Sequence, residues 1–199
     1  DSLAYLLRHD TVYRNWGHDV KVDGANLVID GKVVKFVSEK DTTKLPWGEL
    51  GIDVVVESTG LFTAYDKAKF HIDCGAKKVV ISAPAKGSDG SVPGETILLG
   101  VNEEKFGTVD ITSNASCTTN AASPLIAILH DKIGIEKAIL NTVHGYTASQ
   151  ALVDGPSKKD LREGRAAAQN IVPSSTGAAI AVTKAFPDLT DKFDGISIR

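Results

Sequence analysis

The sequence has 199 residues, of which 42% are hydrophobic and 24% are charged, and its formal net charge is −3 at pH 7. This composition predicts a soluble globular chain with one large domain or parts of two. The slight negative charge leaves no basic field to hold a nucleic acid, so the lysines are interpreted as an ordinary solvated surface. No apolar run approaches the roughly 20 residues of a membrane-spanning helix, and the first residues have no signal-peptide pattern.

The two cysteines, Cys74 and Cys117, fall on different predicted elements. A disulfide framework is therefore not expected, and a reducing cytoplasmic location is predicted. Cys74 ends a predicted helix and is interpreted as a packing residue. No cluster of Cys, His and carboxylate residues has the spacing of metal ligands, so no metal is expected. Because the sequence contains no methionine and stops within a predicted strand, we expect it to be a partial chain.

The first part of the chain is predicted to contain a short helix and several short strands. Residues 1–9 have the spacing of a helix end, and one face of that helix carries Leu3, Leu6 and Leu7. Asp30 and Gly31 are a strong signal for a two-residue hairpin turn. The strands expected around this turn are residues 20–22, 27–29 and 32–37.

Residues 52–56 and 78–81 are nearly all apolar and β-branched, as expected for strands that are covered on both faces of a parallel sheet. Small polar residues follow each of them, at the edge where open α/β sheets bind ligands. A helix with a glycine stop is expected between them, at residues 63–75. Further strands at residues 96–99 and 109–112 complete an alternating β/α order, which predicts a doubly wound parallel sheet.

The stretch SNASCTTN at residues 113–120 places Cys117 between a strand and a helix. At a helix N-terminus the unpaired N–H groups and the helix dipole lower a thiol pKa from its free value of about 8.5, so a reactive thiolate is predicted, with Ser116 or Asn114 as the cap. Burial as a small apolar residue is the alternative for any free cysteine. Pro124 is a misfit within this helix. The face expected to be buried carries Leu125, Ile128, Leu129 and Ile133.

A cysteine nucleophile needs a partner that exchanges protons near neutral pH, a role to which histidine is suited. Of the five histidines, His144 stands apart because it closes a predicted strand at residues 135–143 and precedes Gly145. Spacing alone does not bring His144 to Cys117, and the order Cys then His also suits a thiol hydrolase. The remaining histidines are interpreted as surface or packing residues: His9, His18, His71 and His130.

The second half of the chain is rich in hydroxyl and guanidinium groups, which together indicate phosphate binding, although capping or solvation is the alternative for each one. Residues 146–169 form a connection of a length that is more often functional. Residues 173–177 open a helix predicted at 178–186, where backbone N–H groups favour an anion. The groups concerned are Ser116, Thr118, Thr147, Ser149, Thr176, Gly177, Arg162, Arg165 and Arg199.

At this point the motifs match a known family. SNASCTTN resembles the active-site signature of the phosphorylating glyceraldehyde-3-phosphate dehydrogenases, and the resemblance covers the whole chain. Six further motifs occur in the family's order: LPWGEL at 45–50, VESTG at 56–60, ISAP at 81–84, TVHGYT at 142–147, DGPS at 154–157 and STGAA at 175–179.

The resemblance implies a mechanism. Cys117 attacks the aldehyde carbon of glyceraldehyde 3-phosphate to give a thiohemiacetal, and His144 is the base that assists hydride transfer to NAD. Inorganic phosphate then cleaves the thioacyl enzyme to 1,3-bisphosphoglycerate. Thr147 and Arg199 match positions that hold the substrate phosphate, with Ser149 where many members have threonine. Positions that hold the attacking phosphate are matched by Ser116, Thr118, Thr176 and Gly177.

The resemblance also implies the fold and the assembly. We expect a partial Rossmann-like, doubly wound sheet lacking its first βα unit, in residues 1–116, followed by the first part of an α+β catalytic domain in residues 117–199. The stretch 146–169 resembles the S-shaped loop at the interface of the family's homotetramer. Cofactor positions are matched by Ser58, Thr59, Gly60, Phe62 and Ser82.

The sequence departs from the family in lacking the glycine-rich phosphate turn and the acidic residue that reads the adenosine ribose. No two glycines stand two apart, so no G-x-G-x-x-G replaces that turn. The choice between NAD and NADP is therefore open, and the chain by itself is expected to be inactive.

Alternatives to the triose phosphate enzyme remain open. Within the class, the alternative is a dehydrogenase of erythrose 4-phosphate or another phosphorylated aldehyde, although Gly145, Tyr146 and Thr147 after the histidine favour the triose enzyme. Outside the class, the alternatives are a thiol hydrolase that uses Cys117 and His144, or a non-catalytic binding protein.

Overall fold

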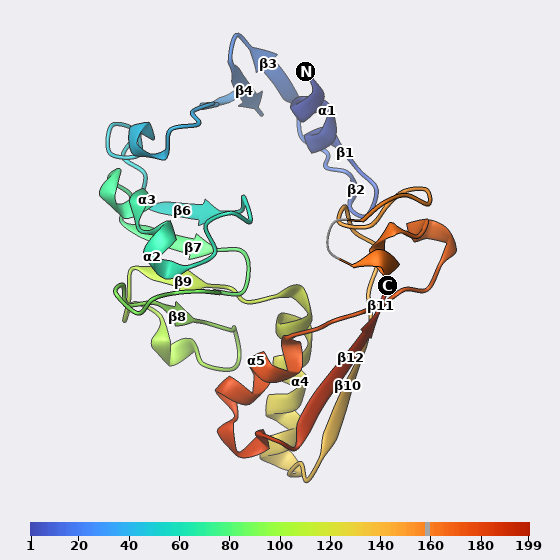
Figure 1. Cartoon of the computed structure of the whole chain (residues 1–199). Helices are drawn as coiled ribbons and strands as arrows, with labels where there is room; N and C mark the ends of the chain where they lie inside the picture. The colour runs from blue at the N-terminus through green and yellow to red at the C-terminus, as the bar shows by residue number, and fades with distance from the viewer. Residues whose placement is uncertain (158–159) are drawn as a thin grey trace. The chain divides into compact units, whose positions relative to one another are not determined.

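The computed structural model describes residues 1–157 and 160–199 and contains two compact units, Asp1–Leu45 and Pro46–Arg199. The first unit begins with helix α1 (Ser2–Arg8), as predicted, although the side chains of Leu3, Leu6 and Leu7 are exposed. Two antiparallel sheets follow (Figure 1). Their strands are β1 (His9–Asp10) and β2 (Arg14–Asn15), then β3 (Val20–Asp23), β4 (Asn26–Ile29) and β5 (Lys32–Val34).

The turn between β4 and β5 confirms the hairpin predicted from Asp30 and Gly31. Both residues have positive φ, 48° and 77°, and Ile29 pairs directly with Lys32. Positive φ at both central positions is the requirement of a type I′ turn, whose twist matches that of the flanking strands. A short 3₁₀ turn, η1 (Thr42–Lys44), ends the unit.

The second unit contains a four-stranded sheet, all of whose pairs are parallel, in the order β6-β7-β9-β8. The register pairs Glu57 with Ile81, and Ile81 and Thr96 with Ser113, so the carboxyl ends of all four strands lie at one edge. This alignment brings the segments after each strand together. The strands are β6 (Val54–Glu57), β7 (Lys78–Ile81), β8 (Glu95–Thr96) and β9 (Ile111–Ser113).

The helix predicted at residues 63–75 is present as two consecutive pieces, α2 (Tyr65–Ala68) and α3 (Phe70–Asp73), which link β6 to β7. The β/α alternation predicted beyond β7 is wrong, because only a 3₁₀ turn, η2 (Glu103–Lys105), separates β8 from β9. Burial of the first strand on both faces is also wrong. Val54 and Val56 on the edge strand β6 are more than half exposed, because Ala68 of α2 packs on the opposite face of the sheet, which carries Val79 and Ile81.

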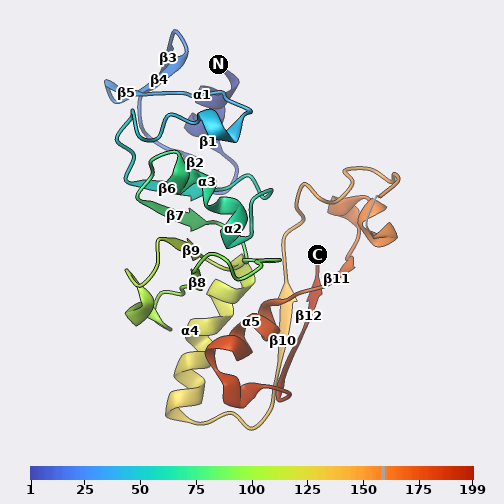
Figure 2. The same cartoon turned by 60° about the vertical axis from the view of Figure 1, so that its left-hand side comes forward.

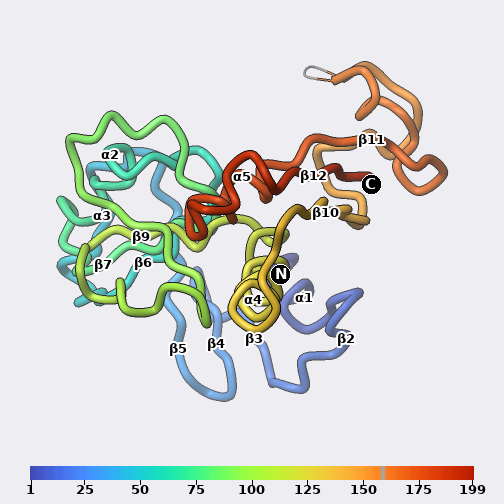
Figure 3. Tube along the Cα trace, turned by 90° about the horizontal axis from the view of Figure 1, so that it is seen from below, coloured from blue at the N-terminus to red at the C-terminus, as the bar shows by residue number. Residues whose placement is uncertain are grey.

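After β9 the chain enters the longest helix, α4 (Cys117–Lys132), and then β10 (Ala138–Val143), which pairs in parallel with β12 (Phe193–Ile198). Helix α5 (Ala178–Ala185) packs against both α4 and β12 (Figure 2). Figure 3 shows α4 nearly along its axis. The remaining elements are β11 (Pro173–Ser174), antiparallel to β12, and the 3₁₀ turns η3 (Leu161–Gly164), η4 (Ala167–Gln169) and η5 (Pro187–Leu189).

The face of α4 that is buried is not the predicted one. Leu125, Ile128 and Ile133 are more than half exposed, and Leu129 is 36% exposed. Small side chains allow the close approach of α5, so α4 packs through the stripe that carries Ala122, Ser123 and Ile126. Pro124 lies inside the helix without ending it. The core formed here also includes Ala179, Val182, Leu189 and Phe193.

Within the described part of the chain, no helix is long and apolar enough to cross a membrane.

Candidate active site

Cys117 is the first residue of α4, at the helix N-terminus where the sequence predicted it. Ser116 is the N-cap, and its hydroxyl accepts a hydrogen bond from the Thr119 amide at 3.0 Å. Asn114, the other predicted cap, instead has its carbonyl bonded by the Asn120 side chain at 2.6 Å. Ala115 turns the chain from β9 into α4 with a φ of 56°, a left-handed conformation that is uncommon outside glycine. The strand end and the cap together fix the direction of the cysteine.

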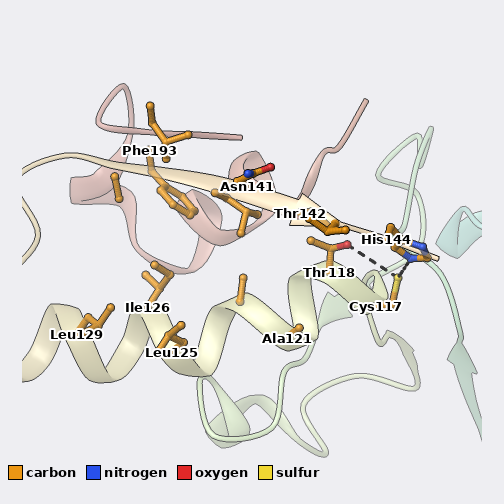
Figure 4. Close-up of a pocket in the computed structure, with 15 residues that line it drawn as sticks. Cys117, Thr118, Ala121, Leu125, Ile126, Leu129, Asn141, Thr142, His144 and Phe193 are labelled. Carbon is orange, nitrogen blue, oxygen red and sulfur yellow. Dashed lines mark hydrogen bonds between the residues drawn. The ribbon is translucent and has the colours of Figure 1, made fainter. Parts of the chain in front are cut away.

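His144 follows the last residue of β10 and faces the thiol, as Figure 4 shows. The distance from Cys117 Sγ to His144 Nε2 is 3.3 Å. The Gly145 carbonyl lies 2.7 Å from His144 Nδ1, so the proton on Nδ1 is donated there and Nε2 is left for the thiol proton. The His144 amide donates to the Ile198 carbonyl at 2.9 Å, which ties the histidine to β12. The pair therefore has the geometry of a nucleophile and its base.

The two groups shift each other's protonation in opposite directions. The hydrogen bond with His144 lowers the pKa of the Cys117 thiol, against a smaller effect of burial, and the Thr118 side chain and amide lower this pKa further. The hydrogen bond to the Gly145 carbonyl and that to Cys117 raise the pKa of His144, while burial and the nearby Arg199 oppose this rise. Both shifts favour a thiolate beside an imidazolium.

Cys117 and His144 open onto a cavity of about 440 Å³, which also brings together Ser116, Thr118, Thr176 and Gly177. Arg199 lines the same cavity and donates to the Thr147 hydroxyl at 3.0 Å, and Thr147 lies 3.2 Å from the Ser149 hydroxyl. Ser149 and Thr147 do not line the cavity themselves. Gly177 is the N-cap of α5, whose first amide at Ala178 donates to the Thr176 hydroxyl.

The lining of this cavity contains cations but no Asp or Glu among the residues that the structure describes. Besides Arg199, it includes Lys86 and Lys184, which the sequence analysis did not single out. The signal available for them was weak, because each is one surface lysine among many. The combination of cations, hydroxyls and a helix N-terminus without a carboxylate suits a doubly charged phosphate ester.

A second, apolar groove of about 610 Å³ runs from the same pair along α4 and β10 (Figure 4). Its walls include Leu125 and Leu129 of α4, which explains why these predicted core residues are exposed. Cys117 and His144 stand at one end of it.

Two predicted phosphate ligands lie outside the cavity. Arg162 pairs with Asp160, and this contact lowers the pKa of the Asp160 carboxyl to about 2, while Arg165 pairs with Asp154. The other histidines also have partners elsewhere: Asn15 for His9, Asp30 for His18, Glu57 and Trp47 for His71, and Asp188 for His130.

In the described residues no group of three or more His, Cys, Asp or Glu side chains is arranged to hold a metal ion.

Two family profiles match the chain. Residues 1–65 match "Glyceraldehyde 3-phosphate dehydrogenase, NAD binding domain", and residues 116–199 match "Glyceraldehyde 3-phosphate dehydrogenase, C-terminal domain". Together they span most of the sequence, including the cysteine, the histidine and Arg199. The chain belongs to the glyceraldehyde-3-phosphate dehydrogenase family. The resemblance read from the motifs is therefore confirmed, as is the mixed α/β fold with a parallel sheet.

Individual relatives agree with this result. The chain is 52% identical to a glyceraldehyde-3-phosphate dehydrogenase of Neurospora crassa over 197 residues, which cover 98% of this chain and 56% of that protein. It is 50% identical to glyceraldehyde-3-phosphate dehydrogenase B of Aspergillus oryzae, over 98% of this chain and 57% of that one. It is 49% identical to glyceraldehyde-3-phosphate dehydrogenase 1 of Kluyveromyces marxianus, over 100% of this chain and 59% of that protein. The chain thus spans less than two thirds of the length of these relatives.

The residues matched to the family's cofactor positions lie at the carboxyl edge of the parallel sheet. Ser58, Thr59 and Gly60 follow β6, and Ser82 follows β7. Gly60 has a φ of 74° and open space on the side where a Cβ would stand, so the backbone there can approach a ligand closely. Phe62 packs edge-on against Phe70 at 4.8 Å. Residues 58–62 fall within the stretch that matches the NAD-binding profile, which ends at residue 65, and Ser82 lies beyond it.

Proposed function

We propose that this chain is part of a phosphorylating glyceraldehyde-3-phosphate dehydrogenase. We use the term full-length protein for a protein that contains this chain and has the length of its relatives. The full-length protein would oxidise glyceraldehyde 3-phosphate to 1,3-bisphosphoglycerate. The observation that carries the proposal is the contact between Cys117 Sγ and His144 Nε2 at 3.3 Å, at the mouth of a cavity lined by cations and hydroxyls.

In the first step, the Cys117 sulfur forms a bond to the aldehyde carbon. The thiol proton passes through His144 Nε2 to the carbonyl oxygen, which gives a thiohemiacetal. Nε2 is suited to this transfer because Nδ1 donates to the Gly145 carbonyl and so fixes the orientation of the ring. The N-terminus of α4, where Cys117 is the first residue, stabilises negative charge near the sulfur.

In the second step, His144 removes the hydroxyl proton as a hydride leaves the same carbon, and a thioester to Cys117 results. When bound, the nicotinamide ring of NAD accepts that hydride. Ser58 and Gly60 are the residues best exposed to hold the dinucleotide, since the hydroxyls of Thr59 and Ser82 are bonded to Glu57.

In the third step, an oxygen of inorganic phosphate attacks the thioester carbon, the carbon–sulfur bond breaks, and the Cys117 thiolate returns. Thr118, Thr176 and Gly177 line the cavity where this phosphate would bind, and Arg199 with Thr147 would hold the phosphate of the substrate. Ser116 and Ser149 are assigned supporting roles, because the Ser116 hydroxyl caps α4 and Ser149 lies beside Thr147.

We also propose the domain boundary, the assembly and the location. The boundary between the NAD-binding and catalytic domains is placed between residues 116 and 117, supported by the C-terminal profile that begins at residue 116. A homotetramer in the cytoplasm is proposed, with residues 146–169 at an interface. Four exposed apolar side chains in this stretch support the interface: Tyr146, Leu152, Val153 and Leu161. Lys158 and Lys159 of the same stretch lie outside the described residues.

The test is an assay of NADH formation by the full-length protein, in which the absorbance of NADH is measured over time. We expect formation to require both glyceraldehyde 3-phosphate and inorganic phosphate, with erythrose 4-phosphate as a poorer substrate. A thiol hydrolase using the same pair would hydrolyse thioesters or peptides without any nicotinamide, so such turnover, without NADH formation, would contradict the proposal. Replacement of NAD by NADP in the same assay decides the cofactor preference.

A further inference from the structure

Glu57 is a buried carboxylate at the carboxyl end of β6, directly before Ser58, Thr59 and Gly60. Its side chain is 2% exposed, and no lysine or arginine pairs with it in the part of the chain that the structure describes. A buried charge without a cation is stable only when hydrogen bonds satisfy its oxygens. The Glu57 carboxylate therefore depends on hydrogen bonds from the groups that surround it, and those groups are held in place by the same bonds.

The oxygens of Glu57 fasten three segments to one another. Carboxylate Oε1 accepts from the Thr59 amide at 2.7 Å and from the Thr59 hydroxyl at 2.5 Å, and Oε2 lies 2.9 Å from His71 Nε2. The main-chain carbonyl of Glu57 accepts from the amide and the hydroxyl of Ser82, at 3.0 and 3.2 Å. Glu57, at the end of β6, thus joins the following turn, helix α3 and the segment after β7.

The chain of bonds continues behind Glu57 to Trp47. An indole N–H can only donate, and Trp47 Nε1 lies 3.0 Å from His71 Nδ1, so Nδ1 accepts and Nε2 carries the proton given to Glu57. His71 is itself 5% exposed. Burial raises the pKa of Glu57, but the hydrogen bonds from Thr59 and His71 together lower it by more. The pKa of Glu57 is therefore below the ordinary value of a glutamate, and the carboxyl is ionised at neutral pH.

These bonds set the form of the turn at residues 58–61. The Thr59 hydroxyl donates to Glu57 and accepts from the Leu61 amide at 3.1 Å, so it is committed within the turn. The exposed side of Gly60 and the Ser58 side chain are left facing outward. A backbone that must approach a dinucleotide closely depends on this shape, because a small displacement would remove the contact.

We propose that Glu57 is a positioning residue for the dinucleotide edge, and that the hydrogen-bonded chain Trp47, His71, Glu57 and Thr59 holds the turn at 58–61 in its binding form. The inference rests on the proposed function, because the ligand is the dinucleotide assigned there. The competing explanation is that the buried hydrogen bonds of Glu57 stabilise the fold and have no effect on the binding turn, since the loss of one partner of a buried polar group destabilises a protein.

The experiment compares Glu57→Gln with Glu136→Gln, an exposed carboxylate in the same unit that makes no side-chain hydrogen bond or ion pair with the described residues. In the full-length protein we expect Glu57→Gln to weaken NAD binding, measured by titration calorimetry, about tenfold or more, the scale of losing a hydrogen bond to a charged group. Amide hydrogen exchange at Thr59 should accelerate by a similar factor, with exchange in β7 unchanged. Alkylation of Cys117 by iodoacetamide should stay within about twofold, because the thiol has its own partner in His144. Glu136→Gln should change none of these.

Two results would overturn the inference. The first is a Glu57→Gln protein with a lowered melting temperature but with unchanged NAD affinity and Thr59 exchange. The second result concerns Trp47→Phe, which is used if Glu57→Gln does not fold. This change removes the indole N–H donor at the far end of the chain and leaves a smaller aromatic ring, and it should change both readouts in the same direction by a smaller factor. No change in either readout would contradict the inference. A wild-type protein that binds no NAD contradicts the proposed function itself, whereas normal NADH formation with unaltered NAD affinity in Glu57→Gln contradicts the positioning role alone.

Discussion

Cys117 Sγ lies 3.3 Å from His144 Nε2, although 27 positions separate the two residues in the chain. Two structural features produce this contact. Strand β9 ends at the carboxyl edge of the parallel sheet, and α4 begins there with Ser116 as the N-cap and Cys117 as the first helical residue. Strand β10 then places His144 beside the end of β12, from which Arg199 reaches the same cavity. Three side chains from three elements thus converge on one cavity.

Alkylation of Cys117 should begin at a lower pH than that of an ordinary thiol. Iodoacetamide reacts with the thiolate, and the pKa of Cys117 is lowered, first by His144, so the rate should rise with pH through a midpoint below the free-thiol value of about 8.5. The pKa of His144 is raised, by its hydrogen bonds to the Gly145 carbonyl and to Cys117, in the direction that favours an imidazolium beside the thiolate. The measurement is the pH profile of the alkylation rate, with glutathione as the reference. A midpoint at or above that of glutathione would show that the pair does not activate the thiol.

Replacing His144 by asparagine should slow turnover of the full-length protein by about 10²-fold or more, the usual scale for loss of a general base. The same change should raise the midpoint of the alkylation profile, because the largest cause of the lowered pKa of Cys117 is removed. Steady-state kinetics and alkylation check the two effects separately. Slower turnover with an unchanged alkylation midpoint would mean that His144 acts without the hydrogen bond to sulfur.

Replacing Arg199 by glutamine should raise the KM for glyceraldehyde 3-phosphate by about tenfold or more, since a charge-assisted contact to phosphate is lost. Oxidation of unphosphorylated glyceraldehyde should change much less. Arg8→Gln, on the exposed face of α1, is the matched control and should leave both KM values unchanged. Equal losses with both aldehydes in Arg199→Gln would argue for a structural role instead.

Replacing Gly75 by alanine should destabilise the chain by more than the same change at Gly107. Both glycines have positive φ, 105° and 83°, but a Cβ at Gly75 would stand 2.6 Å from the Gly48 Cα, whereas Gly107 faces open space. We expect about 1 kcal/mol of lost unfolding free energy at Gly107, the typical cost of the left-handed conformation, and more at Gly75. Urea unfolding of both variants tests this difference, and equal values would contradict the close contact.

Local chemistry was sufficient to predict much of this structure. The Asp30 and Gly31 turn, the strand Lys78–Ile81 and the position of Cys117 at the start of α4 each depend on nearby residues. The face of α4 that is buried could not be predicted in this way, because the packing of α5 selects it. The partners of His71 could not be predicted either, since Glu57 and Trp47 lie 14 and 24 positions away.

The family resemblance supplied what local patterns could not. Spacing left the contact between Cys117 and His144 open, and it gave no reason to prefer Arg199 over Arg162 or Arg165 as a phosphate ligand. The structure separates these arginines, because Asp160 and Asp154 pair with the other two, while Arg199 contacts Thr147. Glu57 was part of a recognised motif, yet its role depends on a buried hydrogen-bond network that only coordinates reveal.

The central claim is that the Cys117 sulfur carries the substrate as a thioester during turnover. Full-length protein mixed with NAD and glyceraldehyde 3-phosphate in the absence of inorganic phosphate should produce a burst of about one NADH per active site. Mass spectrometry should then locate a 3-phosphoglyceroyl group on Cys117. Cys74→Ser should retain the burst and the adduct, and Cys117→Ser should lose both. A burst of normal size in Cys117→Ser, or an acyl group on any other residue, would contradict the account.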